Sequence, residues 1–267
     1  GVILLIGIYY YVTLPAINIH STDTWFYIAG LIVFILVFYI IRKRMRPTEI
    51  RESKPAKAML TVLLAVGVVY LIGSILSSPI VNAKKYQKLL KVEKGNFTED
   101  VEEVSFDRVP LLDKDTAEIL GDRKMGSMVD MVSQFEADDI YTQINYKERP
   151  VRVTPLKYAS FIKWITNQSE GIPAYIRIDM ASQNTELVKL DQGIKYSTSE
   201  YLNRNIYRHL RFRYPTAIFD ELSFEIDDKG VPYWVAPVKK FNIGLFGGET
   251  VGSVVLCNAV TGECKSY

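Results

Sequence analysis

The chain has 267 residues and a formal net charge of +2, and 48% of its residues are hydrophobic. That length leaves room for a membrane segment and one or two small soluble domains. Two cysteines, Cys257 and Cys264, are too few for a fold built on disulfides. The first 41 residues contain one acid, Asp23, and no Lys or Arg. This composition excludes an ordinary soluble surface for that block.

The first 81 residues predict three transmembrane helices. The apolar stretches are residues 2–17, 25–41 and 59–81. The second and third are about long enough to cross roughly 30 Å of hydrocarbon, and each must be helical because lipid offers no partner for free backbone groups. The first is short, and the chain begins at Gly1 rather than Met and stops directly after a strand-like run. We therefore expect a piece of a longer protein with a truncated first span.

The loop between the second and third spans predicts the orientation. Residues 42–57 hold seven Lys or Arg and two Glu, whereas residues 18–24 hold no basic residue. The positive-inside rule then places residues 42–57 in the cytoplasm and everything after residue 81 outside. Specific binding of anionic lipid or of nucleic acid by the basic loop is the alternative interpretation.

Residues 82–112 predict a stalk followed by a first strand at 101–106. This stretch is basic next to the membrane and becomes acidic at residues 99–103. Basic residues beside the outer leaflet are expected to meet lipid headgroups without specific recognition.

A repeated pattern organises the rest of the chain. Residues 149–157 (RPVRVTPLK) and 231–239 (VPYWVAPVK) share Pro-x-x-Val-x-Pro-aliphatic-Lys, 82 positions apart. The same offset aligns two capping-box patterns, at residues 115–118 (DTAE) and 197–200 (STSE). The fold class that follows is N-terminal transmembrane α-helices followed by α+β, with two tandem helix-plus-antiparallel-sheet modules at 113–190 and 191–267.

Each predicted module begins with a capped helix, at 116–125 or 198–211. An alternating strand follows, at 140–146 or 222–227, and turns into the proline-containing strand. Because proline removes N–H donors, we expect these strands to be short, at a sheet edge, or bulged. The last elements are hairpins, at residues 174–190 and 252–267.

The second module resembles the PepSY domain. The resemblance rests on residues 221–238 (ELSFEIDDKGVPYWVAPV) and 254–267 (VVLCNAVTGECKSY). The last hairpin of that family typically carries Asp-Ala-x-Thr-Gly, and here Asn258 takes the place of the Asp while Thr261 and Gly262 match. The first module departs further, with DMASQ at residues 179–183. The resemblance covers residues 197–267 well and 115–190 weakly.

The resemblance implies a small module in which a helix packs on an antiparallel sheet. Such modules occur outside the membrane in bacteria and are associated with binding or inhibiting peptidases and with regulation of the cell envelope. Membership of the family supplies no active-site residues to carry over.

The sequence predicts no catalytic residue, no cofactor and no metal site. His20 and His209 are the only histidines, which is too few for a His-based metal site or a Ser-His-Asp triad. The paired acids lie at turn positions without the spacing of an EF-hand. The glycine-rich residues 244–248 (GLFGG) lack the Lys-Ser/Thr of a phosphate-binding loop.

Candidate partner-binding residues come from three places. Tyr233 and Trp234 stand where the two copies of the repeated pattern differ. Two apolar residues are expected to project from the glycine-rich loop, and a basic run is interleaved with aromatic residues. These candidates are Leu245, Phe246, Arg204, Arg208 and Arg211.

Two of these features have alternatives. The basic run is either a polyanion-binding surface or a solvated helix face, and the predicted outside location argues against nucleic acid. Cys257 and Cys264 flank the last turn, where they are either a cross-strand disulfide or two small strand hydrophobes.

The sequence favours a membrane-anchored, extracytoplasmic binding or regulatory protein of the bacterial cell envelope that is not an enzyme. Its partners would be the lipid bilayer and a protein such as a peptidase or wall-processing enzyme. The alternative is an accessory subunit or regulatory part of a membrane enzyme or transporter. Ionisable residues within the spans would favour that alternative, and residues 25–41 and 59–81 contain none.

Overall fold

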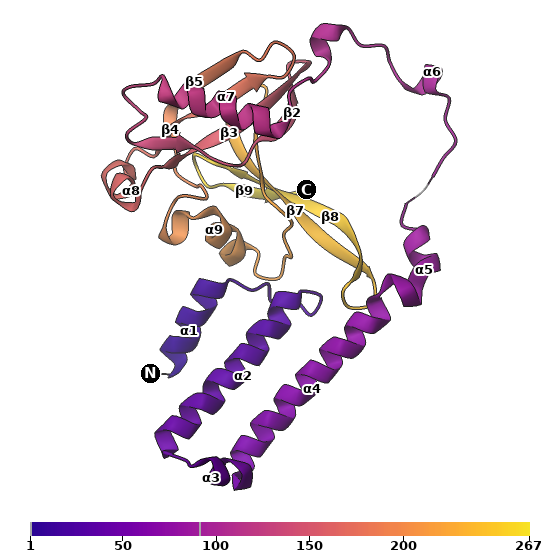
Figure 1. The fold of residues 1–267 in the computed structure, drawn as a ribbon, viewed down its shortest axis with the longest axis vertical. Helices are drawn as coiled ribbons and strands as arrows, with labels where there is room; N and C mark the ends of the chain where they lie inside the picture. Colours follow the sequence, from indigo (N-terminus) through magenta and orange to yellow (C-terminus); the bar gives the residue numbers. More distant parts are fainter. Residues whose placement is uncertain (1, 91) are drawn as a thin grey trace. The chain divides into compact units, whose positions relative to one another are not determined.

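The computed structural model describes residues 2–90 and 92–267, and these fall into two compact units (Figure 1). One unit comprises the N-terminal helices together with residues 211–218 and 239–252. The other comprises residues 93–210, 219–238 and 253–267. We call them the helical unit and the sheet unit and describe each by itself.

The helical unit is built on two long apolar helices. Its elements are α1 (Val2–Thr13), α2 (Thr22–Lys43), α3 (Pro47–Glu52), α4 (Lys54–Ser77) and α5 (Pro79–Gln87). Among the described residues, α2 and α4 are long and apolar enough to cross a membrane, each with a mean hydropathy of 2.5. The third apolar helix, α1, has only 12 residues. The last predicted span, at 59–81, ends earlier than expected, at Ser77. Ser78 has an extended backbone, and Pro79 has no N–H with which to continue α4.

The segment between the helices and the sheets contains short turns of helix. These are α6 (Phe97–Asp100) and the 3-10 turn η1 (Phe106–Arg108). The first strand predicted at 101–106 is wrong, because these residues have no neighbouring strand within the described chain and their side chains are exposed. Alternation of Val with Glu is compatible with a strand only where a partner strand is present.

The helix expected at 116–125 is present with a different N-cap, and the helix expected at 198–211 is not one continuous helix. Helix α7 (Lys114–Gly126) begins after Asp113, whose carboxylate accepts the amide of Thr116 at 2.7 Å. Residues 198–211 do not form one helix but give η2 (Leu202–Arg204) and α9 (Ile206–Arg213). The side chain of Asn205 bonds the start of α9, whereas the residues of the predicted cap are turned inward.

The sheet unit contains two sheets. The first has the order β1-β3-β4-β5, with β2 also paired to β3, and α8 (Phe161–Asn167) links β3 to β4. Its strands are β1 (Phe135–Ala137), β2 (Thr142–Tyr146), β3 (Arg149–Tyr158), β4 (Ile172–Asp179) and β5 (Thr185–Ile194). The second has the order β6-β7-β8-β9. Its strands are β6 (Ser223–Ile226), β7 (Pro232–Ile243), β8 (Gly247–Asn258) and β9 (Cys264–Ser266). Residues of β7 and β8 belong to both units.

The two proline-containing strands are long and central rather than short or at an edge. Strand β3 has 10 residues and β7 has 12, and each has neighbours on both sides. Pro155 faces the break between β1 and β2, where its carbonyl accepts the amide of Asp138 at 3.0 Å. The carbonyl of Pro237 accepts the amide of Asp220 at 2.9 Å in the same way. Each missing N–H therefore faces a position where regular pairing is already interrupted.

The two sheets share one core. Tyr175 of β4, Phe224 of β6 and Trp234 of β7 are fully buried. The ring of Phe224 lies 6.1 Å from that of Tyr175 and 5.4 Å from that of Trp234. Aromatic side chains bury a large apolar area, so this cluster holds the two sheets together.

Candidate binding groove

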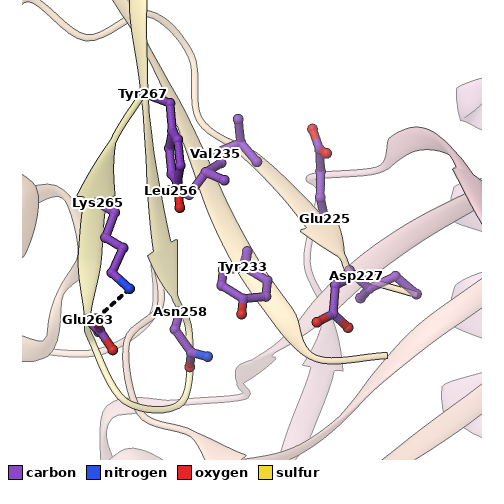
Figure 2. Close-up of a pocket in the computed structure, with 10 residues that line it drawn as sticks. Glu225, Asp227, Tyr233, Val235, Leu256, Asn258, Glu263, Lys265 and Tyr267 are labelled. Atoms are coloured by element: carbon purple, nitrogen blue, oxygen red, sulfur yellow. Dashed lines mark ion pairs between the residues drawn. The ribbon is translucent and has the colours of Figure 1, made fainter. Parts of the chain in front are cut away.

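An open groove of about 340 Å³ lies on the outer face of the second sheet (Figure 2). Strand alternation explains which side chains reach it. On β7, Tyr233 and Val235 face the groove, whereas Trp234 and Ala236, which alternate with them, are completely buried. The lining residues come from all four strands and the turns beside them, and they are Glu225, Ile226, Asp227, Tyr233, Val235, Leu256, Asn258, Glu263, Lys265 and Tyr267.

The groove has an apolar and aromatic floor with an acidic rim. Three carboxylates and one ammonium line it. The ammonium of Lys265 lies 3.1 Å from Glu263, and this hydrogen bond and charge raise the pKa of Lys265. The carboxylate of Asp227 accepts two backbone amides of its own turn, and Glu225 accepts the hydroxyl of Ser223 at 3.0 Å. The rim therefore carries a net negative charge.

A disulfide and a hydrogen-bonded turn fix one side of the groove. Cys257 and Cys264 lie directly opposite each other on β8 and β9 and are bonded. The side-chain oxygen of Asn258 accepts the amides two and three residues later, both at 2.9 Å. Gly262 follows with a positive φ of 73°, which glycine adopts without strain.

A matching groove of about 350 Å³ occurs on the first sheet. Val151 corresponds to Tyr233 at the 82-residue offset, and residues 177–186 correspond to 256–265 at an offset of 79. The charges differ, since this groove holds three cations and two carboxylates. Its lining residues are Tyr146, Lys147, Arg149, Val151, Arg177, Asp179, Ser182, Asn184 and Glu186.

Tyr233 and Trp234 have different roles. Tyr233 lines the groove, as described above. The prediction that Trp234 contacts a partner is wrong, because its side chain is fully buried and its indole N–H donates to the carbonyl of Tyr196 at 2.8 Å. The alternation of β7 turns this residue inward, toward the other sheet.

The three predicted arginines make contacts within the chain. Arg204 donates to the carbonyl of Gln168 at 2.7 Å, and Arg208 lies beside the carbonyl of Leu202. In the helical unit, Arg211 donates to Leu14 at 2.9 Å. Burial lowers the pKa of Arg211, and its contact with a backbone carbonyl at the end of α1 indicates a structural role.

Leu245 and Phe246 do not project into solvent, contrary to the sequence-based expectation. Within the helical unit they are half-buried against Gly73 of α4. The hydroxyl of Ser77 accepts the amides of both residues, at 2.9 and 3.0 Å. The ring of Phe246 lies 5.2 Å from that of Tyr70. The glycine-rich loop is therefore a contact of the β7–β8 hairpin with α4.

Glu200 is a buried acid whose role sequence reasoning missed. Its carboxylate accepts the hydroxyl of Tyr158 at 2.8 Å and the indole N–H of Trp164 at 2.7 Å. Burial and the hydrogen bond to Glu200 raise the pKa of Tyr158. Sequence reasoning also missed Glu225 and Tyr267, which line the groove. Side chains alternate between the two faces along a strand, so alternation along β6 and along residues 264–267 could have identified both.

Both histidines are in contact with backbone carbonyls within the described part of the chain. Each histidine ring lies beside a backbone carbonyl, His20 beside Leu245 at 2.8 Å and His209 beside Gly262 at 2.7 Å. No group of three or more His, Cys, Asp or Glu in the described part of the chain is placed to hold a metal ion. Comparison with protein-family models, curated proteins and solved structures found no match to this chain.

Proposed function

We propose that the chain is a membrane-anchored binding or regulatory protein of the bacterial cell envelope, with two tandem PepSY-like modules outside the membrane. In this proposal α2 and α4 cross the bilayer, and the grooves of the two sheets bind a protein partner such as a peptidase or wall-processing enzyme. The observation that carries the proposal is the pair of equivalent grooves with different charge.

Repeated backbone contacts support a duplicated module. The amide of Met180 donates to the carbonyl of Pro150 at 3.0 Å, and the amide of Ala259 donates to that of Pro232 at 2.9 Å. Arg152 and Trp234, which lie 82 positions apart, also make comparable contacts, because the side chain of each donates to a backbone carbonyl. Arg152 donates to the carbonyl of Leu112 and Trp234 donates to that of Tyr196. A shared frame with different groove residues is what duplication followed by specialisation would produce.

The composition of the grooves supports protein binding. Aromatic side chains flanked by charges are enriched where proteins meet. An aromatic floor would supply the buried contact area, and the opposite charges of the two rims would select the partner and its orientation. A partner that spans both grooves would present a basic region to the second sheet and an acidic region to the first.

The alternative is a regulatory part of a membrane enzyme or transporter. The contact of Leu245 and Phe246 with Ser77 favours it, because a strand hairpin that continues into the second sheet is held by a long apolar helix. Such a contact would pass a change at the sheet to α4.

A photo-crosslinking amino acid at Tyr233 tests the proposal in the native membrane. We expect one reproducible protein product, identified by mass spectrometry, whose yield falls when Glu225 is changed to Lys. The same amino acid at Val251, which is 59% exposed and outside the groove, is the control. Equal yields at the two positions would contradict partner binding by this groove. Substrate-dependent activity of the purified protein alone would favour the alternative.

A further inference from the structure

Three grooves of the sheet unit join into one. A third groove, of about 500 Å³, lies between the two already described. It shares Asn258 with the groove on the second sheet, and it shares Tyr146 and Arg177 with the groove on the first sheet. Because neighbouring grooves have lining residues in common, they open into one another. We call the whole the long groove and its third member the middle groove.

Strand alternation shows how the long groove crosses the first sheet. Tyr175, Arg177 and Asp179 are alternate residues of β4, so their side chains lie on one face of that sheet. Tyr175 lines the middle groove, Asp179 lines the groove of the first sheet, and Arg177 lines both. The guanidinium of Arg177 also lies over the ring of Tyr146, 4.7 Å from its centroid. The floor is therefore continuous along β4.

The middle groove follows the outer edge of β5. This strand ends the first sheet, and within the described chain no further strand pairs with its outer edge. The consecutive residues 188–192 all line the middle groove. Since consecutive side chains point to opposite faces of a sheet, a groove that they all line runs along the edge of the strand. The backbone N–H and C=O groups on such an edge are those that an added strand would bond.

The regular part of this edge has the length of an ordinary strand. Residues 185–189 pair one by one with β4, and the register then shifts between Ala174 and Ile172. Strands have about five or six residues on average, and a bulge ends regular pairing. An added strand would therefore be held along residues 185–189. It would leave the edge at the bulge, where Asn258, Val260 and Thr261 of the second sheet and its last turn line the middle groove.

The charge of the long groove changes sign along its length. Three carboxylates and one ammonium line the groove of the second sheet. The middle groove has three cations, Arg177, Lys189 and Lys229, and one carboxylate, Asp191. The groove of the first sheet has three cations and two carboxylates. An occupant therefore meets net negative charge over the second sheet and net positive charge along the rest of the groove.

Ion pairs within the chain leave this pattern unchanged. Three pairs lie in the groove, Glu263 with Lys265, Arg177 with Glu186, and Arg149 with Asp179. The other charged lining residues are Glu225 and Asp227 on the second sheet, Lys189, Lys229 and Asp191 in the middle, and Lys147 on the first sheet. Two acids beside the groove do not reverse the signs, since Asp228 follows Asp227 and Glu148 is paired with Arg108 at 3.4 Å.

On the basis of the proposed function, we infer that the long groove binds an extended polypeptide segment of the partner. Basic residues of that segment lie over the second sheet, and acidic residues lie over the middle groove and the first sheet. The edge of β5 selects an extended polypeptide, because a peptide backbone presents N–H and C=O groups at the spacing of a strand. The charges at the two ends set the direction of the segment.

Crosslinks in the native membrane test whether the occupant is extended. The photo-crosslinking amino acid replaces Tyr233, Gln192 or Asn184 in separate preparations of the full chain, one position in each part of the long groove. We expect the same partner at all three positions, with the crosslinked residues in one short stretch of its sequence and in the order of the groove. Crosslinks to segments far apart in the partner's sequence would overturn the inference and leave the proposed function standing. Absence of a product at all three positions would contradict both.

A synthetic peptide tests the backbone contact with the full chain in detergent. The probe has lysines at one end, glutamates at the other and alternating Thr and Val between them, and it is made in both chain directions. Fluorescence anisotropy should show tighter binding for one direction. A strand bonds its neighbour through every second residue, so N-methylation of one alternate set of amides should weaken binding at least about tenfold and that of the other set should not. Equal effects of the two sets, or no binding in either direction, would overturn the inference.

Charge reversal tests the direction of the segment. Lys189→Glu with Lys229→Glu should weaken binding of the peptide about tenfold, because its glutamates then meet like charges. Replacing those glutamates by lysines in the peptide should restore binding, which also shows that the double variant is folded. Lys163→Glu is the control, because Lys163 lies on α8 and lines none of the three grooves. Equal affinity of the native chain and the double variant for the original peptide would overturn the inference.

Discussion

Asp179 and Asn258 form the same turn with different chemistry. The carboxylate of Asp179 accepts the amides two and three residues later at 3.0 and 2.8 Å, as the side chain of Asn258 does in the second sheet. Burial would raise the pKa of Asp179, but these bonds and the charge of Arg149 outweigh it, and the pKa is lowered. The stability of the turn on the first sheet therefore depends on the ionisation of Asp179, whereas Asn258 in the other turn does not ionise.

We expect Asp179→Asn to remove this pH dependence while keeping the turn. A lowered pKa stabilises the folded state above the unfolded value of about 3.9, and that stabilisation is lost as the pH falls through the lower folded value. Thermal unfolding from pH 7 to pH 3 should show a smaller acid-induced decrease in Tm for the variant than for the native chain. Asn258→Asp, the matched control, should show a larger one. Parallel curves for all three proteins would contradict the assignment.

Tyr141 is a buried hydroxyl without a hydrogen-bond partner in the described part of the chain. It is 7% exposed, and burial raises its pKa, so the group is neutral. Because an unpaired buried polar group is unfavourable, Tyr141→Phe should raise the free energy of unfolding by about 1 kcal/mol. Tyr158→Phe should lower it by about 2 kcal/mol, since it leaves one oxygen of the Glu200 carboxylate unbonded. Unfolding of the full chain in detergent, followed by near-UV circular dichroism, measures both.

The sequence predicts the exposure of a single residue well only where the alternation of side chains along a strand is sufficient to determine it. Tyr233 faces outward on β7, as strand periodicity requires. Trp234 was misassigned because its burial depends on the first sheet, which the local sequence does not describe. Glu200 was read as a helix cap for the same reason, since its partners Tyr158 and Trp164 lie about 40 positions earlier.

At the scale of elements, the loop between β7 and β8 lies close against the backbone of α4 at Gly73 and Ser77. A Cβ at Gly73 would lie 2.7 Å from the terminal Cδ1 of Leu245 and 3.3 Å from the ring of Phe246, so a larger residue would force these side chains to shift. Ser77 is 3% exposed and its hydroxyl accepts two amides of the loop. Few other residues could accept both bonds in so small a space.

We expect Ser77→Ala to release this loop. The amides of Leu245 and Phe246 would lose their acceptor, at a cost of about 1–3 kcal/mol. Hydrogen exchange at residues 243–248 should then become at least about tenfold faster. Ser74→Ala is the control, because Ser74 lies on the same helix and its hydroxyl donates to the carbonyl of Tyr70, one turn earlier in that helix. Unchanged exchange in Ser77→Ala would show that apolar packing alone holds the loop.

Strands were predicted more reliably than helix ends or connections. The strands at 140–146 and 222–227 occur within about two residues of their expected bounds. The helix expected at 116–125 also occurs within two residues, as α7, but its N-cap is Asp113 rather than Asp115, and only the folded chain selects between these two acids. The prolines were misread because a missing N–H is harmless opposite a break in the neighbouring strand, and that break is not visible in a linear pattern.

At the scale of the whole molecule, two kinds of surface coexist in one chain. The helical unit presents apolar side chains over the length of α2 and α4, and only 6% of the apolar 18-residue stretch in each helix is buried. The sheet unit presents two grooves of different charge, one on each antiparallel sheet. The first surface fits a lipid solvent and the second fits a protein partner, so the proposed function needs both. The amino-acid composition is enough to predict the apolar helices. The grooves can be recognised only once the pairing of the strands is known.

Orientation in the membrane is the last property that the charge pattern predicts. The seven cations of residues 42–57 should hold this loop in the cytoplasm, because basic loops resist translocation. Thr48→Cys then lies inside and Ser182→Cys lies outside, and both positions are exposed. The native cysteines are bonded to each other and stay silent toward thiol reagents. An impermeant maleimide on intact cells should label Ser182→Cys, and should label Thr48→Cys only after the membrane is opened. The reverse pattern would invert the topology, and labelling of both in intact cells would argue against anchoring by α2 and α4.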